Sequence, residues 1–136
     1  MTQENKDLLF RDLCARIPYN VKCYNIKYRL DLAEEIICIT VHYNHPCVQL
    51  GTHLYKLEQV RPYLFPLSSM TEEQKKEYRK VCELDTEILS KHPMDETPFP
   101  ALYNSQDWLN KNHFDYRGLI PMGLAIAVTK ENNPYE

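Results

Sequence analysis

The sequence predicts an α+β fold, in which a small, curved antiparallel sheet of four or five short strands is buttressed by three or four helices. Apolar residues recur with a period of two between about residues 21 and 57, and with a helical period near both ends of the chain. Residues 61–80 contain the change from one pattern to the other. Because the strands are short and their connections brief, we expect a partly open SH3-like barrel.

The first element is expected to be a helix over residues 4–16. Its apolar side chains form one stripe, made of Leu8, Leu9, Leu13 and Ile17. Pro18 ends the helix, because a proline cannot continue the hydrogen-bond ladder. The chain of 136 residues fits a single domain. We expect the helix and sheet to fill residues 4–66 and a helical half to fill residues 71–128.

Alternating side chains predict the strands that follow. From Val21 apolar and polar residues alternate, and their parity inverts at Asn25, so we expect a bulge or tight turn there. A polar turn over residues 33–35 leads into residues 36–43, which are apolar on both faces and therefore predict a central strand. A further turn and two short strands are expected at residues 44–46, 47–50 and 53–57.

The segment between the two halves carries two prolines, Pro62 and Pro66. They stiffen the backbone around Leu64 and Phe65, which are too apolar to remain in water, and we expect this segment to dock the sheet onto a second helix. That helix is predicted from Thr71 to Lys91. Its start combines Thr71 with a glutamine three residues later, which is the pattern of a capping box.

The C-terminal part is expected to contain two short helices. After a proline-rich connector over residues 93–100, Asn104 or Ser105 can cap a third helix. Its Trp108 is predicted to pack inward, against three apolar side chains: Leu109, Phe114 and Leu119. A fourth helix is expected between Asp115 and Gly123, and residues 132–136 are expected to fray.

Composition narrows the classes of function. The net charge of −3 and the pI near 6.0 give no overall attraction to nucleic acid. The N-terminus lacks the features of a signal peptide, and no apolar run approaches the length of a membrane span. The five cysteines are an odd number without a CxxC pair. We therefore expect a cytoplasmic protein without a membrane partner, with all five thiols free.

Three stretches carry a resemblance to a known family: residues 8–17, 60–80 and 107–127. Together they resemble an uncharacterised family of small phage and prophage proteins of gut bacteria. The resemblance implies that the protein acts in the cytoplasm of a bacterial host cell. It brings no catalytic residues with it, so the catalytic residues stay unknown.

One alternative function is a metal-dependent hydrolase. His42, His45 and Cys47 lie close together in the sequence, with His53 nearby, and two imidazoles with a thiolate can bind zinc. The spacing supplies no closed set of ligands, and we predict no metal. Neither a GxSxG elbow nor a glycine-rich phosphate loop is present, so an enzyme is disfavoured and no cofactor is expected.

Another alternative is a single-stranded nucleic-acid-binding protein. Basic and aromatic residues interleave on the first strands, at Lys22, Tyr24, Lys27, Tyr28 and Arg29. Such faces bind nucleic acid through cations for phosphates and rings for bases. The simpler interpretation is an exposed strand face made of ordinary long side chains.

The remaining compositional feature is the ten tyrosines, which exceed what a small core needs and are typical of interfaces. The segment from Asp115 to Gly118 is either part of a site or a turn held by Asp115. The predicted binding residues are Lys27, Arg29, Tyr43, Tyr63, Asp115, Tyr116 and Arg117.

The leading hypothesis is a small non-catalytic binding module of a phage-type mobile element. Its partner would be a host protein or a small nucleotide signal, and it would act as an inhibitor of host defence. The oligomeric state is left open.

Overall fold

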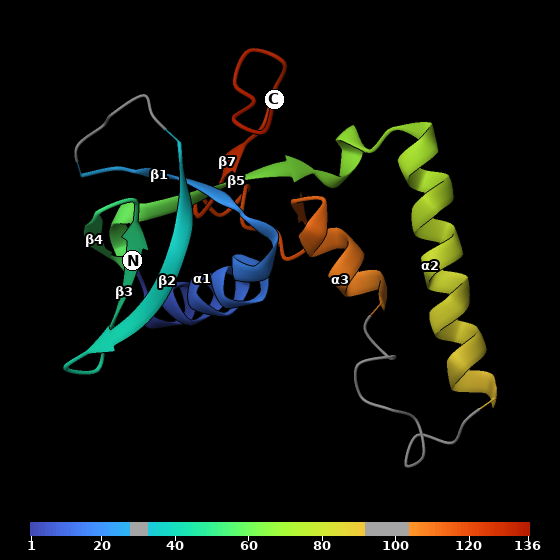
Figure 1. The fold of residues 1–136 in the computed structure, drawn as a ribbon, viewed down its shortest axis with the longest axis horizontal. Helices are drawn as coiled ribbons and strands as arrows, with labels where there is room; N and C mark the ends of the chain where they lie inside the picture. Colours follow the sequence, from blue (N-terminus) through green and yellow to red (C-terminus); the bar gives the residue numbers. More distant parts are fainter. Residues whose placement is uncertain (28–32, 92–103) are drawn as a thin grey trace.

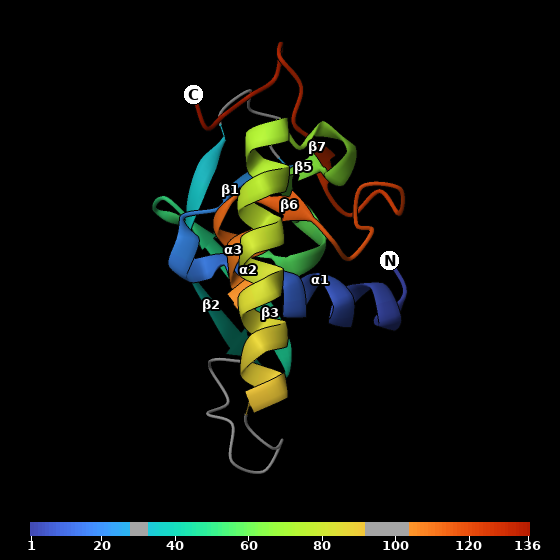
Figure 2. The ribbon, with the colours of Figure 1, turned by 90° about the vertical axis from the view of Figure 1, so that its right-hand side faces the viewer.

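The computed structural model describes residues 1–27, 33–91 and 104–136. Within these residues it is an α+β structure with three α-helices and a seven-stranded, mostly antiparallel open sheet. The α-helices are α1 (Gln3–Arg16), α2 (Glu72–Lys91) and α3 (Asn104–Lys111). Three short 3-10 helices are η1 (Ile17–Tyr19), η2 (Leu57–Gln59) and η3 (Leu67–Ser69). In Figure 1 α1 lies against the sheet, and Figure 2 shows α2 in front of α3, on the side away from the hairpin of β2 and β3.

The strands are β1 (Lys22–Asn25), β2 (Glu34–His42), β3 (His45–Leu50), β4 (His53–Lys56), β5 (Val60–Pro66), β6 (Phe114–Asp115) and β7 (Ile126–Ala127). Their order is β4-β3-β2-β1-β5-β6, and β7 also pairs with β5. Neighbours are antiparallel except that β6 and β7 run parallel to β5. The described residues thus form more strands than the four or five expected, because the C-terminal half adds β6 and β7. The SH3-like barrel is not confirmed.

The observed strand β2 is longer than predicted and less buried than predicted. Residues 34 and 35, expected in a turn, belong to β2 and pair with β1. The strand β1 ends at Asn25, and the apolar alternation predicted beyond it falls partly on residues 28–32, outside the described residues. A register shift lies in β2 between Ile36 and Cys38. Several side chains of β2 are exposed, so this strand is not the doubly covered centre that its composition predicts.

Helix α1 and the sheet enclose the main core. Thr2 caps α1 by accepting a hydrogen bond from the Asn5 amide at 3.1 Å. The helix prediction is confirmed, and Leu9 and Leu13 are fully buried. The other buried members of this core are Val21, Cys23, Ile36, Val48, Leu50, Tyr55, Leu57, Val60, Leu64, Leu119, Leu124 and Ala125.

A second, smaller apolar cluster joins α2 and α3 to the sheet. Trp108 is buried as predicted and stacks on Phe114, with ring centroids 5.8 Å apart. Leu109 belongs to the same cluster, whereas Leu119 belongs to the main core, so that predicted contact is wrong. The docking segment divides between the two, because Leu64 lies in the main core and Phe65 packs against the smaller cluster.

The predicted start of α2 agrees with the structure, whereas the predicted fourth helix does not. Thr71 and Gln74 form the predicted capping box, with two bonds of 2.9 and 3.2 Å. The expected fourth helix is absent from the described residues, since the chain after Asp115 forms turns.

All five cysteines are free, as predicted. Among the described residues no helix has the length and apolar character needed to cross a membrane.

Candidate binding site

Two adjoining hollows lie where the N-terminal half of α1 faces the hairpin of β2 and β3. Their volumes are about 420 and 320 Å³. Both are lined by Lys6, His45, Pro46 and Glu58. The larger adds His42, Cys47 and Lys56, and the smaller adds Gln3, Asp7, Phe10, Val41 and Asn44. Ligand sites for small molecules begin at about this size, roughly 300 Å³.

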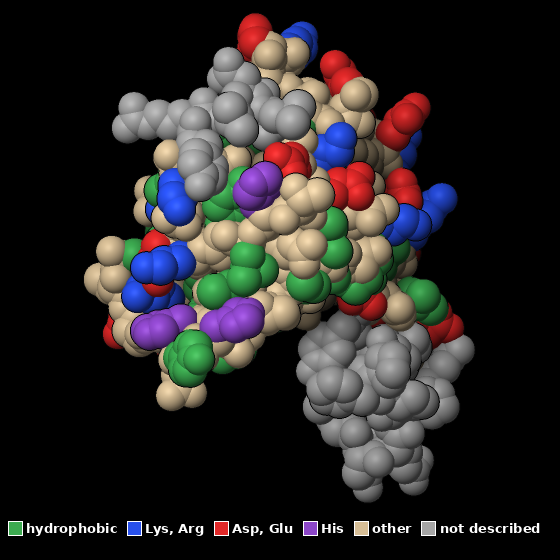
Figure 3. Space-filling view, turned by 60° about the vertical axis from the view of Figure 1, so that its left-hand side comes forward, with side chains coloured by type: hydrophobic (Ala, Val, Ile, Leu, Met, Phe, Trp, Pro, Cys, Tyr) green, Lys and Arg blue, Asp and Glu red, His purple; other side chains and the backbone are tan. Residues whose placement is uncertain are grey.

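The hairpin that forms one wall is set by its turn. Tyr43 and Asn44 make a two-residue connection, and their φ angles of 49° and 65° are both left-handed. Two such residues in succession suit the twist of a β-hairpin, and asparagine tolerates this conformation well. The turn places His42 opposite His45 and leaves the Tyr43 side chain in solvent. Figure 3 shows histidine side chains on this face beside lysine and acidic side chains.

An ion pair links α1 to the other wall. The Lys6 Nζ lies 2.9 Å from the Glu58 Oε1, and both side chains are about one-third exposed. The bond from Lys6 lowers the pKa of the Glu58 carboxyl, which therefore stays charged at neutral pH. Lys56 lies across from Cys47 in the β3–β4 pair and lines the larger hollow. The two lysines outweigh the single glutamate, so the larger hollow is net positive.

The histidines and the thiol do not assemble into a metal site. Among the described residues no group of three or more His, Cys, Asp or Glu side chains could hold a metal ion. The Cys47 thiol instead donates a long bond of 3.8 Å to the carbonyl oxygen of His45. His53 is hydrogen-bonded to Thr52. The metal-dependent hydrolase therefore gains no support from this part of the chain.

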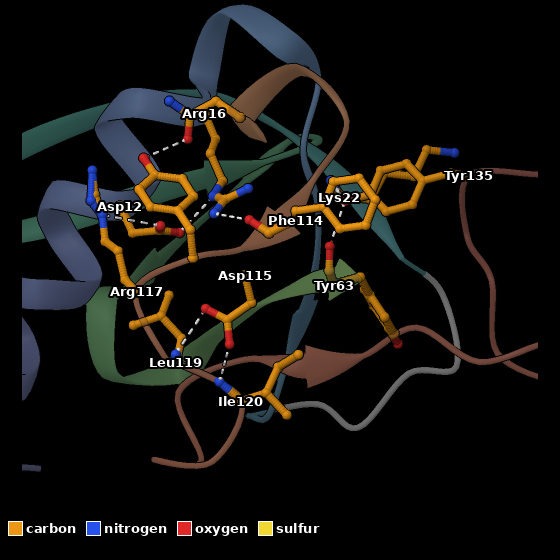
Figure 4. A network of polar contacts seen from close by, with 12 residues as sticks. Asp12, Arg16, Lys22, Tyr63, Phe114, Asp115, Arg117, Leu119, Ile120 and Tyr135 are labelled. Atoms are coloured by element: carbon orange, nitrogen blue, oxygen red, sulfur yellow. Dashed lines mark hydrogen bonds and ion pairs between the residues drawn. The ribbon is translucent and has the colours of Figure 1, made fainter. Parts of the chain in front are cut away.

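The side chains of residues 115–117 make polar contacts within the molecule, and Figure 4 shows this network. The Asp115 carboxylate accepts hydrogen bonds from the amides of Leu119 and Ile120, both at 2.9 Å. The Tyr116 hydroxyl donates to the side chain of Asn110. Asp115 thus holds a turn, the simpler of its two predicted roles, and a binding role for it stays a prediction.

A buried ion pair within α1 makes further contacts to Phe114 and Arg117. The Arg16 Nε lies 2.8 Å from the Asp12 Oδ2, and both side chains are fully buried. Arg16 also donates to the carbonyl oxygen of Phe114 at 2.7 Å. Burial raises the pKa of the Asp12 carboxyl, although the charges of Arg16 and Arg117 oppose this shift. The guanidinium of Arg117 lies over the Tyr116 ring, 3.4 Å from Asp12 through its Nε.

Tyr135 anchors the C-terminal segment that was expected to fray. Its hydroxyl accepts from the Lys22 amide at 3.0 Å and donates to the Tyr63 carbonyl oxygen at 2.7 Å. It therefore bridges β1 and β5 next to Pro62, which has no amide to donate. The Tyr135 ring stacks on His113 with centroids 4.0 Å apart, and burial lowers the pKa of His113 to about 4.

The structure brings few of the predicted binding residues together. Tyr43 lies at the tip of the hairpin beside the hollows, Lys27 is exposed in the turn after β1, and Tyr63 is buried. Arg29 lies outside the described residues. Sequence reasoning missed Lys6, Lys56 and Glu58, because no local pattern indicates that the start of α1 meets the hairpin.

Comparison of the chain with protein families, with curated proteins and with solved structures finds no match. The resemblance to small phage proteins therefore stays an expectation from the sequence.

Proposed function

We propose that this chain is a small non-catalytic binding module and that its ligand occupies the larger hollow. The sequence leaves two classes of partner, a host protein and a small nucleotide signal. The hollow favours the nucleotide, because its volume of about 420 Å³ is that of a small-molecule site. The observation that carries this proposal is the gathering of Lys6, Lys56 and two histidines around one hollow.

The lining suits a ligand with both a charged and an apolar part. Lys6 and Lys56 can donate to phosphate oxygens, and such charge-assisted bonds are stronger than neutral ones. The imidazole N–H groups of His42 and His45 supply further donors. Pro46 and Phe10 offer apolar surface for a base or a sugar ring.

The biological part of the proposal depends on the resemblance. A phage-type protein that holds a signalling nucleotide in the cytoplasm of its bacterial host would lower the free concentration of that signal. It would thereby inhibit a defence that the signal activates. We also propose that β1 to β5 form a partly open SH3-like barrel.

A titration with nucleotides tests the ligand class. Fluorescently labelled mono- and cyclic dinucleotides should bind the protein at low ionic strength, with affinity that falls as salt is added. Lys56→Gln should weaken binding about tenfold, the equivalent of one charge-assisted hydrogen bond. Lys76→Gln, the same change on the exposed face of α2, is the matched control. Absence of binding, or equal weakening in both variants, would reject the larger hollow as the site.

The nucleic-acid alternative is tested in the same assay. A labelled single-stranded oligonucleotide that binds more tightly than any mononucleotide would favour it, and Lys27→Gln should then weaken the complex. If Lys56→Gln weakens that complex instead, the oligonucleotide occupies the hollow through its phosphates.

A further inference from the structure

The two hollows beside the hairpin share a boundary but differ in charge. Lys6 and Glu58 line both hollows, so their ion pair lies where the two adjoin. The larger hollow adds Lys56, and two lysines therefore face one carboxylate there. The smaller hollow adds Asp7 instead, and two carboxylates face one lysine. The larger hollow thus favours the anionic part of a ligand, and the smaller one favours a part that offers hydrogen-bond donors.

One side of α1 forms a wall of the smaller hollow. Four of its lining residues follow at intervals of three and four positions and share this side of the helix: Gln3, Lys6, Asp7 and Phe10. The Gln3 side chain donates to the Asp7 Oδ1 at 2.8 Å, and Phe10 packs against the main core. These contacts orient the carboxylate and the ring. The carboxylate can accept further bonds, because its two oxygens together offer about four acceptor sites.

The hairpin supplies the other wall, and part of it is apolar. Val41 of β2 and Pro46 of β3 are partners across the strand pair, and both line the smaller hollow. The Val41 side chain is 62% exposed, so most of its surface is available to a ligand. A flat ring in this hollow can pack against Phe10 and Val41 and present its edge to Asp7. A nucleobase combines such an apolar face with a polar edge.

The carboxylate of Asp7 distinguishes among the bases. A carboxylate only accepts hydrogen bonds, so it pairs best with two adjacent N–H donors on one edge of a ring. Guanine has such an edge, made of a ring N–H and the neighbouring amino group. Adenine and cytosine place an acceptor nitrogen beside their amino group, and uracil places carbonyl oxygens beside its ring N–H. Those edges would set an acceptor against an oxygen of Asp7, so the carboxylate favours guanine.

We propose that the two hollows bind the two parts of one guanine nucleotide, with the phosphate in the larger hollow and the base beside Asp7 in the smaller. This assignment rests on the proposed function, and it adds the base and the orientation of the ligand. Lys6 lies at the junction of the two parts. Its ammonium has more than one N–H donor, so Lys6 can bond to a phosphate oxygen while it stays paired with Glu58.

Isothermal titration calorimetry with nucleoside monophosphates tests the choice of base. Guanosine monophosphate should bind about tenfold more tightly than inosine monophosphate, which lacks the amino group, because a site built for a donor rejects the analogue without it. It should also bind more tightly than the adenosine, cytidine and uridine monophosphates.

A substitution of Asp7 tests the residue itself. Asp7→Asn should weaken the binding of guanosine monophosphate about tenfold. The same variant should gain affinity for xanthosine monophosphate, because the asparagine amide can donate to the carbonyl oxygen that replaces the amino group in xanthine. Glu4→Gln removes a carboxylate from the same helix outside both hollows, so this control should keep the preference for guanine. Circular dichroism checks that both variants are folded.

The orientation is tested with the two parts of the ligand separately. In NMR spectra of the backbone amides, guanosine alone should shift the signals of Asp7 and Val41. Inorganic phosphate alone should shift those of Cys47 and Lys56. Shifts of the same amides by both probes would overturn the orientation.

The outcomes separate this proposal from the one on which it rests. Nucleotides that bind through Lys56 without a preference for guanine would overturn the guanine site and leave the larger hollow as a binding site. A preference for guanine that Asp7→Asn leaves unchanged would have the same meaning. Absence of binding by every nucleotide would reject both proposals.

Discussion

Around α1 and β5 polar side chains lie in buried contacts, whereas at the hairpin of β2 and β3 they lie at the surface. In the first region Asp12 and Arg16 are fully buried and Tyr135 bridges two strands. In the second, Val41 and Tyr43 are exposed and two hollows open beside the turn. The difference indicates that the first region provides stability and that the second is available to ligands and partners.

The largest effect is expected from the buried ion pair. Arg16→Leu leaves the buried Asp12 with only the longer contact to Arg117 and the Phe114 carbonyl oxygen without its donor, and should lower the free energy of unfolding by about 3–5 kcal/mol. Lys75→Ala breaks the exposed pair with Glu72 and should cost less than about 0.5 kcal/mol. Urea unfolding monitored by circular dichroism measures both. If the two variants lose similar amounts, the buried network does not hold this region together.

Leu64 and Leu67 provide a second test of the difference between buried and exposed side chains, within one segment. Leu64 is fully buried in the main core, so Leu64→Ala should lower the free energy of unfolding by about 2–4 kcal/mol. Leu67, three residues further on, is exposed, and Leu67→Ala should cost less than about 0.5 kcal/mol. A thermal melt of Leu64→Ala that matches the wild type would show that this side chain is not in the core.

His113 should make the stability depend on pH. Its pKa is lowered by burial to about 4 in the folded protein, from 6.5. The unfolded chain therefore takes up a proton first as the pH falls, so this contribution is complete above pH 6.5 and is lost between 6.5 and about 4. His113→Asn, which suits the local φ of 62°, should flatten that part of the pH profile. A His113→Asn protein that keeps the wild-type slope between pH 6.5 and about 4 would contradict this prediction.

The smallest stability effect is expected at Tyr135. Tyr135→Phe keeps the stacked ring but removes the hydroxyl that joins Lys22 to Tyr63, which should cost about 1 kcal/mol. Tyr43→Phe changes an exposed hydroxyl and serves as the control. Denaturant unfolding of both proteins makes the comparison. Equal stabilities would mean that the C-terminal segment is not anchored through this hydroxyl.

The features that the sequence predicts correctly are those with local causes. The capping box of Thr71 and Gln74 and the turn held by Asp115 depend on residues within a few positions of each other. Several features with non-local causes escaped prediction. The strands β6 and β7 have two residues each and exist through their pairing with β5, so they show no period of their own. No local sequence pattern around Tyr135 indicates its contacts with Lys22 and Tyr63.

The candidate site divides in the same way. His42, His45 and Cys47 attracted attention because they are close in the sequence, and they do line one hollow. Lys6 and Glu58 are separated by 52 positions, and only the packing of α1 on the sheet brings them together. The same packing places the exposed Val41 in the wall of the smaller hollow, beside α1.

Amide hydrogen exchange, followed by NMR in dilute protein, tests the contrast between the two regions most directly. The amides of Lys22 and Leu119 are bonded inside the first region and should exchange slowly, as should Thr40, which is bonded to β3. The amides of Ile39 and Val41 lie on the side of β2 with which no described strand pairs beyond Ile36, and they should exchange rapidly. Exchange of Ile39 and Val41 that is as slow as that of Thr40 would contradict the difference between the two regions.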